Sequence, residues 1–308
     1  MANTAYQAST ENRAERGVRT RNEAEQLAST LPPLLVDAEQ LASSIWLGVH
    51  GRRKAGMGET FWQFRRYRHE DPSSAIDWRQ SAKSQHVFVR EREWEAAETV
   101  WFWRDASLGM RYSSSPNVVE KWERATVLAL ALASLLVRGG ERIGLLGASA
   151  APATGRVALR RMAHRLSDLI PEEADLPPDL PAKRHCELVW ISDFLQPLDD
   201  IESRIKRLAY SGAHGFLVQM IDPAEEDFPF TGRARFEART VRDTQILGRA
   251  ENVQTTYRAR YKAHAEAVGV FARRVGWTFL RHRTDRSPGT ALIALYGALG
   301  GERAKRGF

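Results

Sequence analysis

The stretch TVWFWRDASLGM, residues 99–110, decides the fold of this chain. Its first five residues, Thr99–Trp103, are β-branched or aromatic, and such side chains favour a strand. A polar loop follows, and then an apolar helix from about Val118 to Arg138, which Gly139 and Gly140 end. A strand, a loop and a covering helix together form one repeat of an α/β fold.

The same alternation of strands and helices continues toward the C-terminus. The sequence predicts strands at Arg142–Leu146, Glu187–Ile191, Gly215–Ile221 and Trp277–Arg281, an edge hairpin within Arg233–Ile246, and helices at Arg156–Leu169, Ile201–Tyr210, Asn252–Val275 and Gly289–Leu299. We therefore expect a mostly parallel sheet with helices on both faces. Such sheets carry their functional residues at the carboxyl ends of the strands.

The residues before Glu98 have a different character. Short helices are predicted at Asn22–Ser29 and Asp37–Trp46, whereas Gly48–Lys83 is rich in Gly, Arg and aromatic residues without clear periodicity. We divide the chain into a disordered tail (1–20), an N-terminal helical and irregular extension (21–97), an α/β domain (98–300) and a basic tail (301–308).

Composition limits the class of protein. Of the 308 residues, 43% are hydrophobic and 27% are charged, which is typical of a folded globular chain. Cys186 is the only cysteine, so the chain can form neither an intramolecular disulfide nor a cysteine-based zinc site. The longest apolar stretch, Thr126–Val137, is too short to span a bilayer, and residues 1–30 lack the apolar core of a secretory signal. We expect a cytoplasmic protein with no membrane span.

The charge is distributed unevenly along the chain. The net charge is +7, but residues 231–308 contain 16 Lys and Arg against 6 Asp and Glu, whereas residues 167–202 contain 2 against 10. This asymmetry suits the steering of a charged partner. It suits equally well two faces of one domain that neutralise each other.

Two acidic residues follow strands of the predicted sheet. Asp105 comes after Thr99–Trp103, and Asp193 comes after Glu187–Ile191. If the two strands are neighbours, both carboxylates lie at the same edge of the sheet together with the hydroxyl of Ser107. These oxygens are the hard ligands that Mg²⁺ prefers. The alternative is that Asp105 and Ser107 only cap the backbone of the following loop and helix.

The chain resembles a known bacterial family at these residues. The spacing Asp105-x-Ser107-x-Gly109 is similar to the Asp-x-Ser-x-Ser opening of the metal-ion-dependent adhesion site of von Willebrand factor A-type domains. More specifically, the chain resembles the family called domain of unknown function 58 over about residues 48–300. The segments that carry this resemblance are Gly56–Glu59, Phe64–Tyr67, Glu70–Pro72, Ile76–Lys83, Val89–Glu91, Ile191–Phe194, Asp222–Glu225, Phe228–Phe230 and His282–Asp285.

The resemblance implies an α/β, von Willebrand A-like (Rossmann-like) fold behind the N-terminal extension. It also implies a partner, because members of this family are often encoded beside a MoxR-type AAA+ ATPase. Asp105, Ser107 and Asp193 are its candidate metal ligands, and Thr154 is the one candidate for a further ligand. Gly109 replaces the second serine and supplies no side-chain oxygen, so we expect a degenerate site that binds Mg²⁺ or another divalent cation weakly. Serine in place of Gly109 should strengthen that binding.

These observations favour a non-enzymatic protein-interaction module that works with the ATPase in assembling or activating another protein. One alternative is a metal-dependent hydrolase that uses Asp105 and Asp193, although no general base follows from the sequence around them. Another is a nucleic-acid binder, because basic and aromatic residues are interleaved in residues 52–83. Acidic residues in that segment can pair with its arginines, so we favour structural ion pairing there.

Overall fold

The computed structural model describes residues 33–50, 61–68, 76–84, 86–92, 99–168, 175–181, 186–237 and 244–306. The chain divides into two compact units. The hairpin unit is Trp46–Ala97, and the α/β unit combines Glu98–Phe308 with the N-terminal part of the chain up to Ile45. The predicted tail at 1–20 and the predicted helix at Asn22–Ser29 lie outside the described residues.

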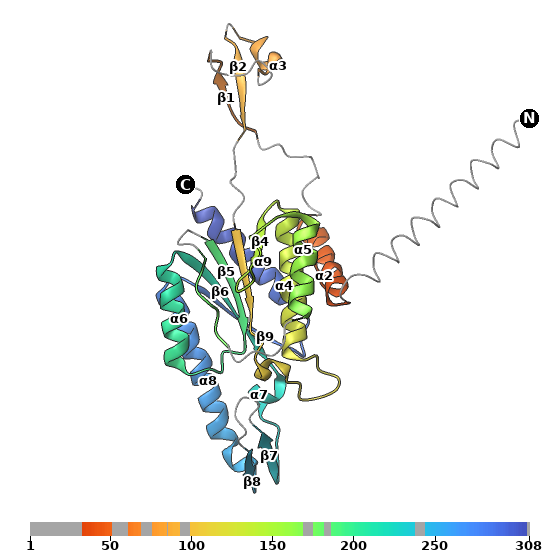
Figure 1. Ribbon diagram of the computed structural model, residues 1–308, viewed down its shortest axis with the longest axis vertical. Helices are drawn as coiled ribbons and strands as arrows, with labels where there is room; N and C mark the ends of the chain where they lie inside the picture. The colour runs from red at the N-terminus through yellow and green to blue at the C-terminus, as the bar shows by residue number, and fades with distance from the viewer. Residues whose placement is uncertain are drawn as a thin grey trace, which may run out of the picture. The chain divides into compact units, whose positions relative to one another are not determined.

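A five-stranded parallel sheet forms the centre of the α/β unit (Figure 1). Its strands are β3 (Thr99–Arg104), β4 (Arg142–Leu145), β5 (Cys186–Ser192), β6 (Ala213–Ile221) and β9 (Thr278–Arg283). They lie in the order β4-β3-β5-β6-β9, and each neighbouring pair is parallel. The predicted mostly parallel sheet is thus confirmed. After β3 the chain first adds β4 on one side and then β5 on the other, so the topological switch point lies between β3 and β5.

Helices cover both faces of this sheet, as predicted (Figure 1). They are α4 (Lys121–Arg138), α5 (Gly155–Ser167) and α9 (Pro288–Arg306) on one face, and α6 (Leu198–Tyr210) and α8 (Glu251–Arg274) on the other. Because the sheet is covered twice, β5 is buried along its whole length and the Ala- and Leu-rich part of α4 is buried as well. Helix α9 continues well past Leu299, where the sequence predicts its end.

Helix α2 (Pro33–His50) contains the predicted helix Asp37–Trp46 and extends it at both ends. Its buried side chains recur at helical spacing, at Leu35, Ala38, Ala42 and Ile45. Arg138 at the end of α4 donates a hydrogen bond to Ser43 Oγ of this helix (3.1 Å). The first part of α2 therefore packs on the α/β unit as a further layer.

The sequence predicts an edge hairpin of the main sheet within Arg233–Ile246, but the structure has a separate hairpin there. Strands β7 (Ala234–Glu237) and β8 (Thr244–Leu247) pair with each other as a separate antiparallel sheet, and β9 forms the edge of the main sheet. The hairpin packs through aromatic contacts, in which the ring of Phe228 lies 5.6 Å from that of Phe236 and 4.6 Å from that of Tyr257 in α8. These contacts anchor the hairpin by its side chains, so it needs no main-chain pairing with the sheet.

The hairpin unit contains part of the family segment. Strand β1 (Phe61–Arg66) pairs antiparallel with β2 (Phe88–Arg92), and the short helix α3 (Trp78–Ser81) lies between them in the chain. Asp77 caps α3 by accepting a hydrogen bond from the backbone N–H of Gln80 (2.9 Å). Trp78 is 67% exposed. The segments Gly56–Glu59 and Glu70–Pro72 lie outside the described residues.

Candidate functional site

The switch point brings Asp105 and Asp193 to the carboxyl edge of neighbouring strands. Asp105 directly follows β3, and its backbone N–H donates to the carbonyl of Ile191 in β5 (2.9 Å). Ser192, the last residue of β5, donates its hydroxyl to Asp105 Oδ2 (2.7 Å). The two strand ends are therefore joined by main-chain and side-chain hydrogen bonds.

Asp105 is enclosed by donors and is fully buried. Its Oδ1 accepts from the backbone N–H of Ser107 (2.7 Å), and its Oδ2 accepts from Ser192 Oγ and from Gln196 Nε2 (3.1 Å). Burial and then the charge of Asp193 raise the pKa of Asp105 from 3.8 to about 6, although the hydrogen bonds from Ser107 and Ser192 oppose that rise. Asp105 is thus a structural acceptor that holds a proton more readily than an exposed aspartate does.

Gly109 lies next to both Asp193 and Ser107. A Cβ atom added at Gly109 would lie 3.0 Å from Asp193 Oδ2 and 3.6 Å from Ser107 Oγ. The structure therefore brings together all four residues that the sequence singled out. It also gives a physical reason for glycine at 109, because a larger residue would press on the Asp193 carboxylate. Thr154, the other candidate ligand, is exposed at the N-cap of α5.

Two residues that the sequence analysis did not assign to the site complete it. Lys121, the first residue of α4, is fully buried, and its Nζ lies 2.9 Å from Asp193 Oδ2 and 2.5 Å from Glu225 Oε1. Burial by itself would lower the pKa of Lys121, but the charges of Asp193 and Glu225 outweigh it and raise the pKa above its ordinary value. Lys121 is therefore a charged ammonium group between two carboxylates.

Glu225 is held in place by the local sequence of helix α7 (Pro223–Asp227). Asp222 is its N-cap, accepting from the backbone N–H of Ala224 (2.8 Å), and Glu225 Oε2 accepts from the backbone N–H of Asp222 (3.0 Å). This capping box leaves Oε1 of Glu225 directed at Lys121. The other carboxylate oxygen of Asp222 accepts from the backbone N–H of Ser114, which ties α7 to the loop before α4.

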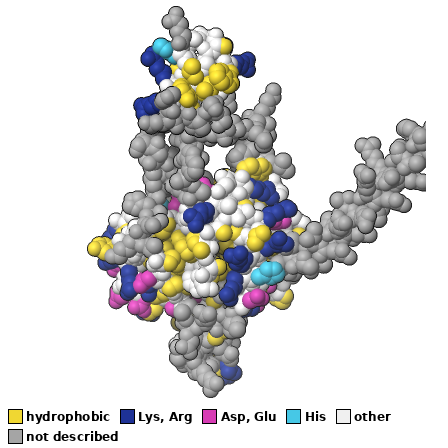
Figure 2. Space-filling model, turned by 45° about the horizontal axis from the view of Figure 1, so that its top comes forward, with side chains coloured by type: hydrophobic (Ala, Val, Ile, Leu, Met, Phe, Trp, Pro, Cys, Tyr) yellow, Lys and Arg dark blue, Asp and Glu magenta, His cyan; other side chains and the backbone are white. Residues whose placement is uncertain are grey.

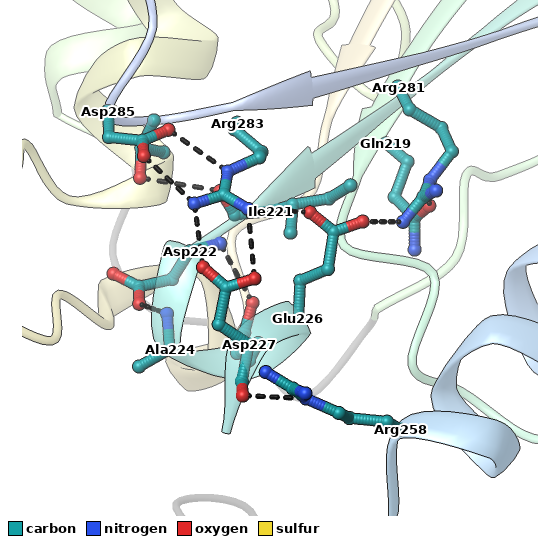
Figure 3. Close-up of polar contacts among 12 residues, drawn as sticks. Gln219, Ile221, Asp222, Ala224, Glu226, Asp227, Arg258, Arg281, Arg283 and Asp285 are labelled. Atoms are coloured by element: carbon teal, nitrogen blue, oxygen red, sulfur yellow. Dashed lines mark hydrogen bonds and ion pairs between the residues drawn. The ribbon is translucent and has the colours of Figure 1, made fainter. Parts of the chain in front are cut away.

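The other acidic residues of α7 face a pair of arginines at the end of β9 (Figure 3). Arg283 lies 2.9 Å from carboxylate oxygens of Glu226, Asp227 and Asp285, and Arg281 lies 2.8 Å from Glu226. The hydrogen bonds from Arg283 hold the pKa of Asp285 below its ordinary value. Helix α7 is thus fixed from two sides, by Lys121 through Glu225 and by the arginines through its other carboxylates.

Hydrogen bonds also hold the loop after β5. Phe194 has a left-handed backbone (φ 53°), and its carbonyl lies 2.7 Å from Nε2 of His264 in α8. Gln219 Nε2 donates to the carbonyl of Asp193 (3.1 Å), and Asp193 Oδ1 accepts from the backbone N–H of Leu195 (3.2 Å). These bonds fix the direction of the Asp193 side chain toward Lys121.

The donor set does not fit a divalent cation in this arrangement. Both carboxylate oxygens of Asp105 and both of Asp193 already accept hydrogen bonds, and an ammonium group lies beside Asp193 Oδ2. Within the described ranges, no group of three or more His, Cys, Asp or Glu side chains could hold a metal ion. Mg²⁺ requires near-octahedral oxygen ligands, which this cluster does not offer. Weak metal binding by Asp105, Ser107 and Asp193 stays a prediction.

The parallel sheet and the buried charged residues at its switch point define the class of this protein. It is an α/β protein with a cluster of charged side chains at the carboxyl ends of β3 and β5. Residues 63–267 match the model of the family described as "Protein of unknown function DUF58", and the chain belongs to that family.

The chain is also similar to individual proteins. It is 26% identical over 279 residues to uncharacterized proteins Rv1480 of Mycobacterium tuberculosis and Mb1516 of Mycobacterium bovis, which covers 84% of this chain and 86% of each relative. Among solved structures, the conserved hypothetical protein BatB of Bacteroides thetaiotaomicron matches 67% of this chain and 98% of its own, with 12% identity and a TM-score of 0.37. An aerotolerance-related membrane protein of Bacteroides fragilis matches with 13% identity and the same TM-score, over 64% and 96% of the two chains. No helix within the described ranges is both long and apolar enough to cross a membrane.

Proposed function

We propose that this chain is a cytoplasmic, non-enzymatic, von Willebrand A-like protein-interaction module. Its proposed partner is a MoxR-type AAA+ ATPase, with which it acts in assembling or activating another protein. The parallel sheet with Asp105 and Ser107 at its switch point supports the von Willebrand A-like assignment. The partner rests on the family resemblance of the sequence.

One observation carries the proposal: the charged groups of the site bond one another, while the loops that hold them present apolar side chains outward. Leu108 follows Ser107 and is 42% exposed, and Leu195 follows Phe194 and is 47% exposed. Asp105, Asp193 and Lys121, which are close to the two leucines in the sequence or bonded to residues beside them, are buried. Exposed leucines next to a hydrogen-bonded, buried cluster suit the docking of another protein.

The same geometry gives the hydrolase alternative less support. Water activation requires a carboxylate or metal that substrate can reach, whereas the Asp105 side chain is enclosed by Ser107, Ser192 and Gln196. The raised pKa of Asp105 follows from burial and from the charge of Asp193. None of these residues is an accessible nucleophile that Asp105 could activate.

Charge on α5 supports electrostatic steering of an acidic partner. This helix contains no acidic residue, and no ion pair within the described residues involves its exposed arginines, which are Arg156, Arg160, Arg161 and Arg165. Figure 2 shows Lys and Arg side chains gathered over one side of the α/β unit. Surface charge of one sign raises association rates in a salt-dependent way.

Capture of the ATPase from a lysate of the native cell, with and without ATP, tests the proposal. The double variant Leu108→Asp/Leu195→Asp should recover at least about tenfold less ATPase than wild type, because two charges would enter an apolar contact. The matched control is Ile293→Asp, which changes a residue of α9 that is 53% exposed and should leave capture unchanged. Equal recovery of the ATPase by wild type and the double variant, with all three proteins folded, would contradict docking at these loops.

A further inference from the structure

We infer that the ammonium group of Lys121 is the resident cation of this site and takes the place of a divalent metal ion. The inference rests on the geometry of the charged cluster and needs no partner protein. Its test is therefore independent of the test of the proposed docking function.

The first argument is charge balance. The Asp193 side chain is buried and that of Glu225 is mostly buried, with 5% and 13% exposed, and an uncompensated carboxylate in such a place is unfavourable. Within the described part of the chain, Lys121 is the one cation with a nitrogen within hydrogen-bond distance of either carboxylate. Without it, the cluster of Asp105, Asp193 and Glu225 would lack a buried positive charge at its centre.

The second argument is the fit of the ammonium group to its surroundings. An ammonium group has three N–H donors, and two of them are used by Asp193 Oδ2 and Glu225 Oε1. The ring centroid of Tyr112 lies 5.9 Å from Nζ, a distance at which an aromatic face attracts a cation. The backbone N–H of Lys121 also donates to the carbonyl of Tyr112 (3.3 Å), so the same residue positions both ends of the lysine.

The third argument is space around the shared oxygen. Asp193 Oδ2 contacts the ammonium group on one side, and the position of a Cβ at Gly109 lies 3.0 Å from it on another. A serine at 109 that contributed a metal ligand would have to displace this carboxylate. Glycine at 109 and lysine at 121 therefore belong to one arrangement, in which a side-chain ammonium group takes the place of the metal ion among carboxylate oxygens.

The test is whether removal of the lysine creates a need for metal. Lys121→Ala leaves two buried carboxylates without a cation and leaves space beside them. We expect its melting temperature in EDTA to fall by about 10 °C relative to wild type. Millimolar Mn²⁺ should then raise the melting temperature of this variant by about 5 °C or more, whereas that of wild type should change by less than about 1 °C.

Two control variants separate a specific metal effect from a general one. Lys121→Ala/Asp193→Asn removes a carboxylate as well as the lysine and should lose most of the stabilisation by Mn²⁺. Lys262→Ala breaks an exposed pair with Glu266 in α8 and should respond to Mn²⁺ as wild type does. If Lys121→Ala unfolds in EDTA, the readout is the fraction that refolds with Mn²⁺, which should exceed the fraction without it.

Binding of Mn²⁺ to wild type gives an independent readout by electron paramagnetic resonance. We expect no stoichiometric binding, because Lys121 already compensates the carboxylates. Stoichiometric binding to wild type at micromolar Mn²⁺ would overturn the inference. A Lys121→Ala protein that gains nothing from Mn²⁺, Mg²⁺ or Ca²⁺ in stability or in refolding would overturn it as well.

Discussion

Replacing Asp105 with Asn should change how stability depends on pH. The pKa of Asp105 rises from 3.8 in the unfolded chain to about 6 in the fold, because of burial and the charge of Asp193. Each pKa unit corresponds to about 1.4 kcal/mol, so the ionised carboxylate costs the native state about 3 kcal/mol. Because the folded state binds this proton more tightly than the unfolded chain, the contribution of Asp105 to stability falls as pH rises from 4 to 6.

A second buried group changes in the opposite direction over the same range. Burial and then the charge of Arg124 lower the pKa of His282 from 6.5 to about 4, so its protonation favours the unfolded chain as pH falls below 6.5. The wild-type curve alone therefore mixes two opposing effects. The difference between wild type and Asp105→Asn isolates Asp105, because His282 is present in both proteins.

The assay is urea unfolding of both proteins at a series of pH values between 4 and 8, in EDTA. We expect the free energy of unfolding of wild type, minus that of Asp105→Asn, to fall by about 2 kcal/mol as pH rises from 4 to 7, the rest of the change lying below pH 4. Asp285→Asn is the matched control, because Arg283 lowers the pKa of Asp285 and so places its titration below this pH range. Its difference from wild type should stay nearly constant between pH 4 and 8. A difference for Asp105→Asn that stays constant from pH 4 to 7 would refute the reasoning.

Three further substitutions test the packing of the site and the sheet. Glu225→Gln removes one of the two carboxylates at Lys121 and should lower the free energy of unfolding by about 2–4 kcal/mol in urea at pH 7. Gly109→Ala places a Cβ 3.0 Å from Asp193 Oδ2 and should cost about 1–3 kcal/mol in the same assay; no loss would show that the carboxylate moves freely. Gly215→Ala places a Cβ 2.0 Å from the Trp277 ring and should lower the free energy of unfolding by more than about 3 kcal/mol. This loss should be seen as a loss of the near-ultraviolet circular dichroism of the folded protein. Gly297→Ala is its control, because Gly297 in α9 has open space around it and the change should be neutral or stabilising.

The sheet can be predicted from the sequence because its signals are local. Thr99–Trp103 is β-branched or aromatic throughout, Glu187–Ile191 is apolar after its first residue, and an acidic residue follows each run within two positions. The switch-point rule then places Asp105 and Asp193 at one edge of the sheet. Their convergence also requires that the two strands be neighbours, which the sequence left as a condition and the pairing of β3 with β5 fulfils.

Lys121 and Glu225 cannot be found in the same way. Lysine at the start of a helix normally lies on the surface, so no local pattern in the sequence indicates that Lys121 is fully buried. Glu225 belongs to a capping box that is complete without any contact to Lys121. Their pairing depends on the packing of α4 against α7, which are 104 residues apart at the contact. The separate hairpin β7–β8 differs from the predicted edge hairpin for a similar reason, because Phe236 of the hairpin packs on Phe228, which in turn packs on Tyr257 of α8.

The most direct test of the interaction module is the affinity of purified protein for the purified MoxR-type ATPase of the same organism. We predict saturable binding with a dissociation constant in the micromolar range or tighter, weaker at about 500 mM than at about 150 mM NaCl. Leu108→Asp/Leu195→Asp should bind at least about tenfold more weakly than wild type. The absence of saturable binding by wild type, or equal binding by this variant, would contradict the account.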